Sequence, residues 1–250
     1  DQIAHANLCG FGKSVIQAVL EGKVEQLVLV NCCDSMRRVY DIVESTGKCK
    51  FLYMLDMPHE DNDCEKVKLA QGIHRLKKAY EKFSGKTFDR SGFLNAFSHE
   101  PVDNQPYIGV LGVRVSGILE KMIRDNIRMD VENLTCTGGR RLAVIREELE
   151  KMEDDAMFLA YADALLSQMP CFRMNNSTRR NRLYLDPNLK GIIYHTIKFC
   201  DYYGFEYASI KRDIKVPLLK IETDFTSQSA GQLLTRVQAF AETLEGSEDM

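Results

Sequence analysis

Three features of other protein classes are missing from this sequence of 250 residues. It has no run of about 18 apolar residues, the length that crosses a bilayer, and no charged stretch followed by an apolar leader. It also has no marked excess of charge. The formal net charge is -3 and the isoelectric point is near 6.0, so we expect no nucleic acid and no membrane as main partner. We therefore expect a cytoplasmic protein. The chain starts at Asp1 without an initiator methionine, which predicts a processed protein or a fragment.

Two nucleotide-binding patterns are incomplete. The segment 12–14 (Gly-Lys-Ser) ends like a P-loop, but the glycine that this motif needs five residues before Gly12 is Asn7. The dinucleotide fingerprint that would begin at Gly10 has Val15 in place of its third glycine. Because these glycines let the backbone approach a phosphate, both motifs are excluded.

The sequence also lacks any Cys-x-x-Cys pair, which argues against a zinc ribbon and against a ferredoxin-type run. Cysteines are nevertheless numerous. In a cytosolic α/β chain they favour thiol, catalytic or metal chemistry over disulfides. The eight cysteines stand at positions 9, 32, 33, 49, 64, 136, 171 and 200.

Short apolar runs alternate with helical patterns, which is typical of a parallel α/β fold. With 44% hydrophobic and 28% charged residues, the chain can build a packed core. We expect the run 27–30 to be a strand buried on both faces. Further strands are expected at 51–55, 107–111, 129–134, 191–196 and 217–221, and helices at 36–45, 64–83, 116–126, within 141–168 and at 230–244. The inner stripe of helix 64–83 is expected to be Val67, Ile73, Leu76, Tyr80 and Phe83.

Two prolines and a lack of apolar pattern mark residues 98–106 as a domain boundary. The pattern predicts a first α/β domain over 1–97, truncated at its amino end, a linker over 98–106, and a second α/β domain over 107–250. Both domains are expected to be Rossmann-like (flavodoxin-like), with mainly parallel sheets and a ligand site in the cleft between them.

Three of the cysteines follow predicted strands, where parallel sheets bind their ligands. They are Cys33, Cys136 and Cys200. Thiolates gathered in this way suit an iron–sulfur or other soft-metal site, while the alternative is that they are small buried hydrophobic residues.

Other candidates in the sequence are weaker. Cys49 and Cys64 are interpreted as incidental, and Cys32 is ambiguous because neighbouring side chains alternate in direction. His195, in an apolar strand, is expected to be a core histidine with satisfied hydrogen bonds. For Asp34, a helix N-cap is the simplest role.

Several motifs together resemble one family. Leu8-Cys9-Gly10, then Asn31-Cys32-Cys33-Asp34 and Pro170-Cys171, are similar to elements of the 2-hydroxyacyl-CoA dehydratase and benzoyl-CoA reductase family. The tail 216–240 (Val-Pro-Leu-Leu-Lys-Ile-Glu-Thr-Asp-Phe to Val-Gln-Ala-Phe) resembles the most specific stretch of the family. The resemblance covers nearly the whole chain. Members normally carry a substantial region before the first cysteine and a longer helical insert, which are lacking here.

This resemblance implies a [4Fe-4S] cluster in the cleft between the two domains, with Cys9, Cys33 and Cys200 as iron ligands and Cys136 and Cys171 as further candidates. The segment 133–138 (Asn-Leu-Thr-Cys-Thr-Gly) is most similar to the double-cubane branch, which implies a double-cubane [8Fe-9S] cluster as the alternative. That branch usually has a second cysteine two residues after the Pro-Cys cysteine. Here that position is Arg173, which favours a single cubane.

The activity implied by the resemblance is a low-potential, one-electron reduction of a thioester or similar substrate. It follows electron transfer from an ATP-dependent iron–sulfur activator protein. The implied partners are an identical or homologous subunit and an acyl-CoA or other small molecule. The resemblance leaves two alternatives: a double-cubane reductase of small molecules, and a non-catalytic iron–sulfur electron carrier or partner subunit.

Overall fold

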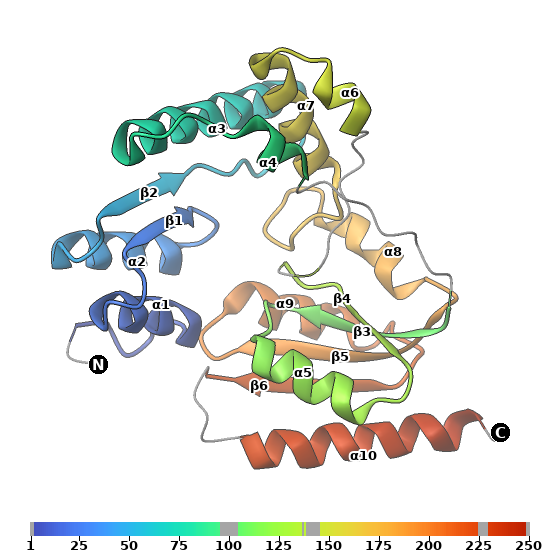
Figure 1. Ribbon diagram of the computed structural model, residues 1–250. Coiled ribbons are helices and arrows are strands. Elements are labelled where there is room, and N and C mark those ends of the chain that lie inside the picture. Colours follow the sequence, from blue (N-terminus) through green and yellow to red (C-terminus); the bar gives the residue numbers. More distant parts are fainter. Residues whose placement is uncertain (1–2, 96–104, 137, 139–145, 225–229, 249–250) are drawn as a thin grey trace. The chain divides into compact units, whose positions relative to one another are not determined.

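A computed structural model of the chain describes residues 3–95, 105–136, 138, 146–224 and 230–248 (Figure 1). The chain divides into two compact units. The first comprises Asp1–Leu8, Gly12–Pro101 and Arg141–Ser177, and the second comprises Cys9–Phe11, Val102–Arg140 and Thr178–Met250. Most of the predicted linker, up to residue 104, lies outside the described residues.

The first unit contains a sheet of two parallel strands, β1 (Gln26–Val30) and β2 (Phe51–Leu55), paired in the register Gln26↔Phe51. Its helices are most of α1 (Gly10–Leu20), α2 (Asp34–Thr46), α3 (Asp63–Ser84), α4 (Arg90–Asn95), α6 (Arg146–Glu150) and α7 (Asp154–Ser167). Glycines in the left-handed conformation, Gly47 and Gly85, end α2 and α3.

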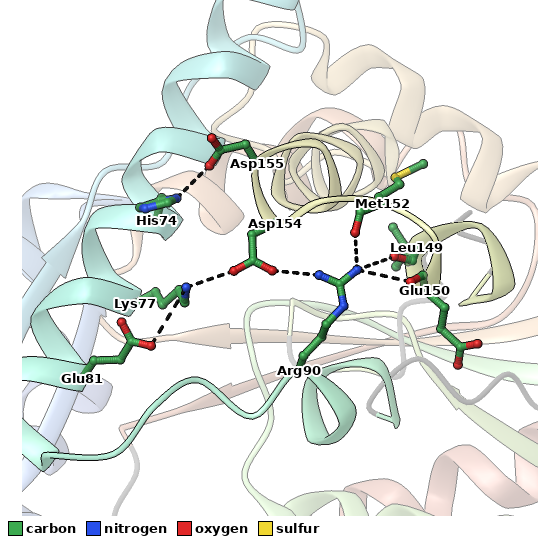
Figure 2. Close-up of polar contacts among 9 residues, drawn as sticks. All are labelled: His74, Lys77, Glu81, Arg90, Leu149, Glu150, Met152, Asp154 and Asp155. Carbon is green, nitrogen blue, oxygen red and sulfur yellow. Dashed lines mark hydrogen bonds and ion pairs between the residues drawn. The ribbon is translucent and has the colours of Figure 1, made fainter.

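Helices α3 and α7 pack against each other and enclose the main core of this unit, which includes Leu69, Met157 and Phe158. Figure 2 shows the polar contacts beside this core. Asp154, in the first turn of α7, accepts from Lys77 at 3.0 Å and from Arg90 at 2.7 Å. Arg90 also donates to the carbonyl groups of Leu149 and Met152 at the end of α6, so one guanidinium joins three helices.

The second unit is built on a four-stranded parallel sheet in the order β4-β3-β5-β6. Its strands are β3 (Tyr107–Gly112), β4 (Asp130–Asn133), β5 (Leu189–Ile197) and β6 (Leu218–Thr223). Its helices are α5 (Gly117–Asn126), α8 (Asn181–Tyr184), α9 (Asp201–Ile210) and α10 (Ala230–Glu248), with a 3₁₀ turn, η1 (Ser177–Arg180), before α8.

Helices α5 and α10 cover one face of this sheet, where Ile123 and Val237 pack against Ile108, Ile193 and Ile221 (Figure 1). The central strand β5 is buried at every position except Lys190. Gly112 ends β3 with φ at +93°, and a Cβ there would lie 2.1 Å from the backbone oxygen of His195. Only glycine fits at this crossing of two strand ends.

The structure confirms the α/β class with parallel sheets and the six predicted strands, whose ends shift by at most two residues. Strand β1, however, is not buried on both faces, since Val28 is 43% exposed. A sheet of two strands leaves one side uncovered. The predicted inner stripe of α3 is buried only in part, since Ile73 packs against the core whereas Val67 is 43% exposed. Tyr80 and Phe83 contact the ring of Phe51 but stay about two-fifths exposed.

No helix within the described part of the chain is both long and apolar enough to span a membrane.

Candidate functional site

Three loops of the first unit are joined by hydrogen bonds beyond the carboxyl ends of β1 and β2. Asn31, directly after β1, donates from Nδ2 to Asp56 at 2.6 Å and accepts at Oδ1 from the Met57 amide at 2.8 Å. Loop 58–61, after β2, is in turn bonded to loop 171–177. The bonds run between His59 and the Arg173 carbonyl, the Asn175 amide and the His59 carbonyl, Asn175 and Glu60, and Asn176 and Asp61.

These loops bring together what we call the cysteine–arginine cluster: Cys32, Cys33, Cys171 and Arg173. Cys33 is the N-cap residue of α2. A hydrogen bond from the Cys32 thiol, together with the backbone amides of Met36 and Ser35, lowers the pKa of Cys33 to about 6. The same bond to Cys33, with burial, raises the pKa of Cys32. Within the pair, the thiolate form is therefore favoured at Cys33 and the thiol form at Cys32.

Arg173 is the charged member of this cluster and is only 8% exposed. Its Nη2 donates to the Pro58 carbonyl oxygen at 2.7 Å. Its Nη1 is buried and has no hydrogen-bond partner among the described residues. The adjacent Met174 is anchored in the α3–α7 core. The guanidinium is therefore fixed in place with one donor group unused.

In the second unit, two predicted ligands lie at the carboxyl edge of the sheet. Cys200 is the N-cap residue of α9, three residues after β5. Cys9 precedes Gly10, and a Cβ on Gly10 would lie 2.2 Å from the backbone oxygen of Asp224, the residue that follows β6. Strands β5 and β6 are neighbours. The chain at Cys9 therefore approaches the same sheet edge as Cys200, and glycine at position 10 permits this approach.

The remaining cysteines occupy varied settings. Cys136 is exposed in the loop after β4, at the other side of the same sheet, and Cys171 is half-buried in the loop after α7. Cys64 is exposed in the first turn of α3, and Cys49 is half-buried just before β2. Among the described residues, no group of three His, Cys, Asp or Glu side chains could hold a single metal ion.

A buried ionic network involves α9, the helix that follows Cys200, and was not predicted from the sequence. Glu206 of α9 forms an ion pair with Arg180 of η1, and both side chains are 2% exposed. The carboxylate also accepts from the hydroxyl groups of Tyr184 at 2.9 Å and of Tyr194. Burial and the negative charge of Glu206 raise the pKa of both tyrosines, which keeps them protonated donors. The network anchors the helix that begins after Cys200.

His195 and Asp34 have settled roles. The ring of His195 bonds the Val113 carbonyl oxygen at 3.2 Å and the Thr223 hydroxyl at 2.8 Å, which confirms a satisfied core histidine. Burial lowers its pKa. Asp34 was predicted as the N-cap of α2, but that cap is Cys33. Asp34 is instead the first helical residue and pairs with Arg37 at 3.1 Å.

Comparison with known proteins settles the family. The sequence model of the family described as 2-hydroxyglutaryl-CoA dehydratase, D-component, matches residues 1–101 and 102–244. The chain belongs to this family. The resemblance drawn from the cysteine motifs and the tail is thereby confirmed.

Two relatives carry dehydratase names. "Putative dehydratase subunit YjiM" of Escherichia coli (strain K12) is 28% identical over 153 residues, which are 57% of this chain and 39% of that protein. "(R)-phenyllactyl-CoA dehydratase beta subunit" of Clostridium sporogenes is 40% identical over 57 residues, 22% of this chain and 15% of that protein. The matches span well under two thirds of either relative. The family model shows that the chain belongs to a dehydratase family. Because the two relatives are covered only in part, their activity and partners are proposals for this chain.

Within the family, the three cysteines that were expected after strands stand there, whereas Cys9 precedes α1 and Cys171 follows α7. Cys33 follows β1, Cys136 follows β4 and Cys200 follows β5. Two features lay beyond the motifs: the unused donor of Arg173 and the Glu206 network. The signal for the first was a charged residue two positions after the cysteine of the Pro-Cys element. The second had no local signal, because its members are 26 residues apart.

Proposed function

We propose that the chain is an iron–sulfur subunit of a 2-hydroxyacyl-CoA dehydratase or benzoyl-CoA reductase-type enzyme. In this proposal Cys9, Cys33 and Cys200 hold a [4Fe-4S] cluster. The observation that carries it is the position of these cysteines within a family of dehydratase subunits. Cys33 and Cys200 follow the strands β1 and β5, and Gly10, the residue next to Cys9, lies against Asp224, which follows β6.

The residues fit the group. Thiolate sulfur is the ligand that iron–sulfur clusters prefer, and the hydrogen bond from Cys32 favours that form of Cys33 by lowering its pKa. The unused Nη1 of Arg173 supplies a buried positive charge, which favours an anionic group nearby. Three cysteine ligands would leave one iron of a cubane open to substrate or water.

When bound, the cluster would supply an electron of low potential to a thioester or a similar substrate. The residues of the chain would prepare this step. The thiolates would hold the iron, and the Glu206 network would fix the helix that begins after Cys200. We propose that an ATP-dependent activator protein delivers the electron and that a homologous subunit completes the enzyme. The name of the Clostridium sporogenes relative as a beta subunit supports the second point.

A dehydration assay tests this function. The anaerobically reconstituted chain would be mixed with a homologous subunit, an activator of the family, ATP and a 2-hydroxyacyl-CoA. We expect formation of the unsaturated acyl-CoA only when ATP is present. Binding of iron without any turnover or acyl-CoA binding would instead favour the non-catalytic electron carrier.

The number of cubanes is a separate question, and Cys136 decides it. We propose one cubane, because the position where the double-cubane branch carries its second Pro-Cys cysteine is Arg173. Cys136→Ser should then retain the full iron content, about four irons per chain. A content of about eight irons, halved by Cys136→Ser, would establish the double-cubane reductase alternative.

A further inference from the structure

Arg173 has a buried donor group, Nη1, that is not used in holding the loops together. A guanidinium has five N–H donors, and here the bond from Nη2 to the Pro58 carbonyl oxygen accounts for one of them. The side chain is 8% exposed, so water satisfies little of the rest. Nη1 is fully buried, and no acceptor among the described residues bonds to it. A buried donor without a partner costs about 1–3 kcal/mol, more when charged.

The surroundings of Arg173 indicate what would satisfy this donor. The neighbouring groups are sulfurs. Arg173, Cys171 and Cys33 each lie close enough to Cys32 to act on it electrostatically. A buried, positively charged donor that lies among sulfur atoms favours an acceptor that carries negative charge, and an anionic sulfur meets this description.

The position of Arg173 is held from several sides. The carbonyl oxygen of Arg173 forms a hydrogen bond with the His59 ring at 3.1 Å. The amide of Met174 donates to the Cys171 carbonyl oxygen, and the amide of Asn175 donates to the His59 carbonyl oxygen. The Met174 side chain is buried among the core residues of α3 and α7. A charge that is held rigidly in a dry environment acts more strongly than a mobile surface charge.

We propose that Arg173 is a positioning residue that donates from Nη1 to an anionic sulfur of the cluster and raises its reduction potential. The inference rests on the proposed function. Reduction adds a negative charge to the cluster. A hydrogen bond and a buried positive charge stabilise the reduced form more than the oxidised form.

The test is a redox titration of the anaerobically reconstituted chain, followed by electron paramagnetic resonance. Arg173→Gln removes the charge. We expect the reduced form to be disfavoured about tenfold, which is a fall of about 59 mV for a one-electron couple. Arg173→Lys keeps a charge without the planar donor fork, and a smaller fall in the same direction is expected. The matched control is Arg37→Gln, which removes an exposed arginine from the first turn after Cys33 and should leave the potential unchanged.

The outcomes separate this inference from the proposed function. Absence of a cluster in the unsubstituted chain would refute the proposed function itself. A normal cluster whose potential is the same in Arg173→Gln and in the unsubstituted chain would refute only the role of Arg173. An equal fall in Arg37→Gln would also refute it, because any nearby charge would then suffice. If Arg173→Gln does not retain iron, the potential of Arg173→Lys decides: a fall supports the inference, and no change overturns it.

Discussion

Replacing Glu206 with glutamine should destabilise the second unit by about 3–5 kcal/mol, because it leaves a buried arginine without its counter-charge. Arg180 and Glu206 are both 2% exposed, so water cannot replace the lost carboxylate. The glutamine keeps the size of the side chain and an oxygen that can accept from Tyr184 and Tyr194. The predicted loss is therefore that of an uncompensated charge and not of a cavity.

Urea unfolding at pH 7, followed by circular dichroism, measures this loss. Adding Arg180→Met to Glu206→Gln removes the orphaned charge, so the double variant should be more stable than Glu206→Gln alone. Lys121→Gln, which breaks the exposed pair with Asp125, serves as the control and should cost about 0.3–0.5 kcal/mol. A loss below about 1 kcal/mol in Glu206→Gln, or a further loss in the double variant, would refute the reasoning.

Three further predictions concern single groups. In the metal-free chain, Cys33 should be alkylated by iodoacetamide with a midpoint near pH 6, and Cys32→Ser should move this midpoint toward the ordinary thiol value of about 8.5, as mass spectrometry would report. Burial lowers the pKa of His195, so the unfolded chain binds a proton that the folded chain resists. Stability should therefore fall as the pH drops through about 6.5, and His195→Gln should weaken this fall; parallel curves would contradict the assignment. Gly112→Ala should cost at least about 1–3 kcal/mol of unfolding free energy, because φ is +93° there and the added Cβ would lie 2.1 Å from the His195 backbone oxygen, whereas Gly117→Ala, with open space around it, should cost nothing.

The strands could be predicted from the sequence because their signal is local. An apolar run such as 51–55 predicts a strand from only five residues. A cysteine that directly follows a predicted strand is then expected at the carboxyl edge of the sheet. Burial was harder to predict. Val28 stands in an unbroken apolar run, yet its exposure depends on how many strands join the sheet, and no pattern within β1 carries that information.

The polar groups of the site depend on contacts between distant segments. In the sequence, Arg180 and Glu206 resemble ordinary charged residues. Their burial as an ion pair depends on the packing of η1 against α9, which the sequence pattern does not indicate. Likewise, the role of Arg173 follows from its bond to Pro58, 115 residues away, which leaves one end of the guanidinium unused. Cys9 was found through the resemblance alone, since no strand precedes it. The structure adds the close approach of Gly10 to Asp224.

The iron content of cysteine variants tests the central claim most directly. The chain and its variants would be reconstituted anaerobically with iron and sulfide, and bound iron and sulfide would be counted per chain. The account predicts about four irons in the unsubstituted chain, in Cys49→Ser and in Cys64→Ser, and a nearly complete loss in Cys33→Ser, because a serine oxygen is a poor substitute for thiolate at iron. A chain that binds no iron, or a Cys33→Ser variant that keeps it all, would contradict the account.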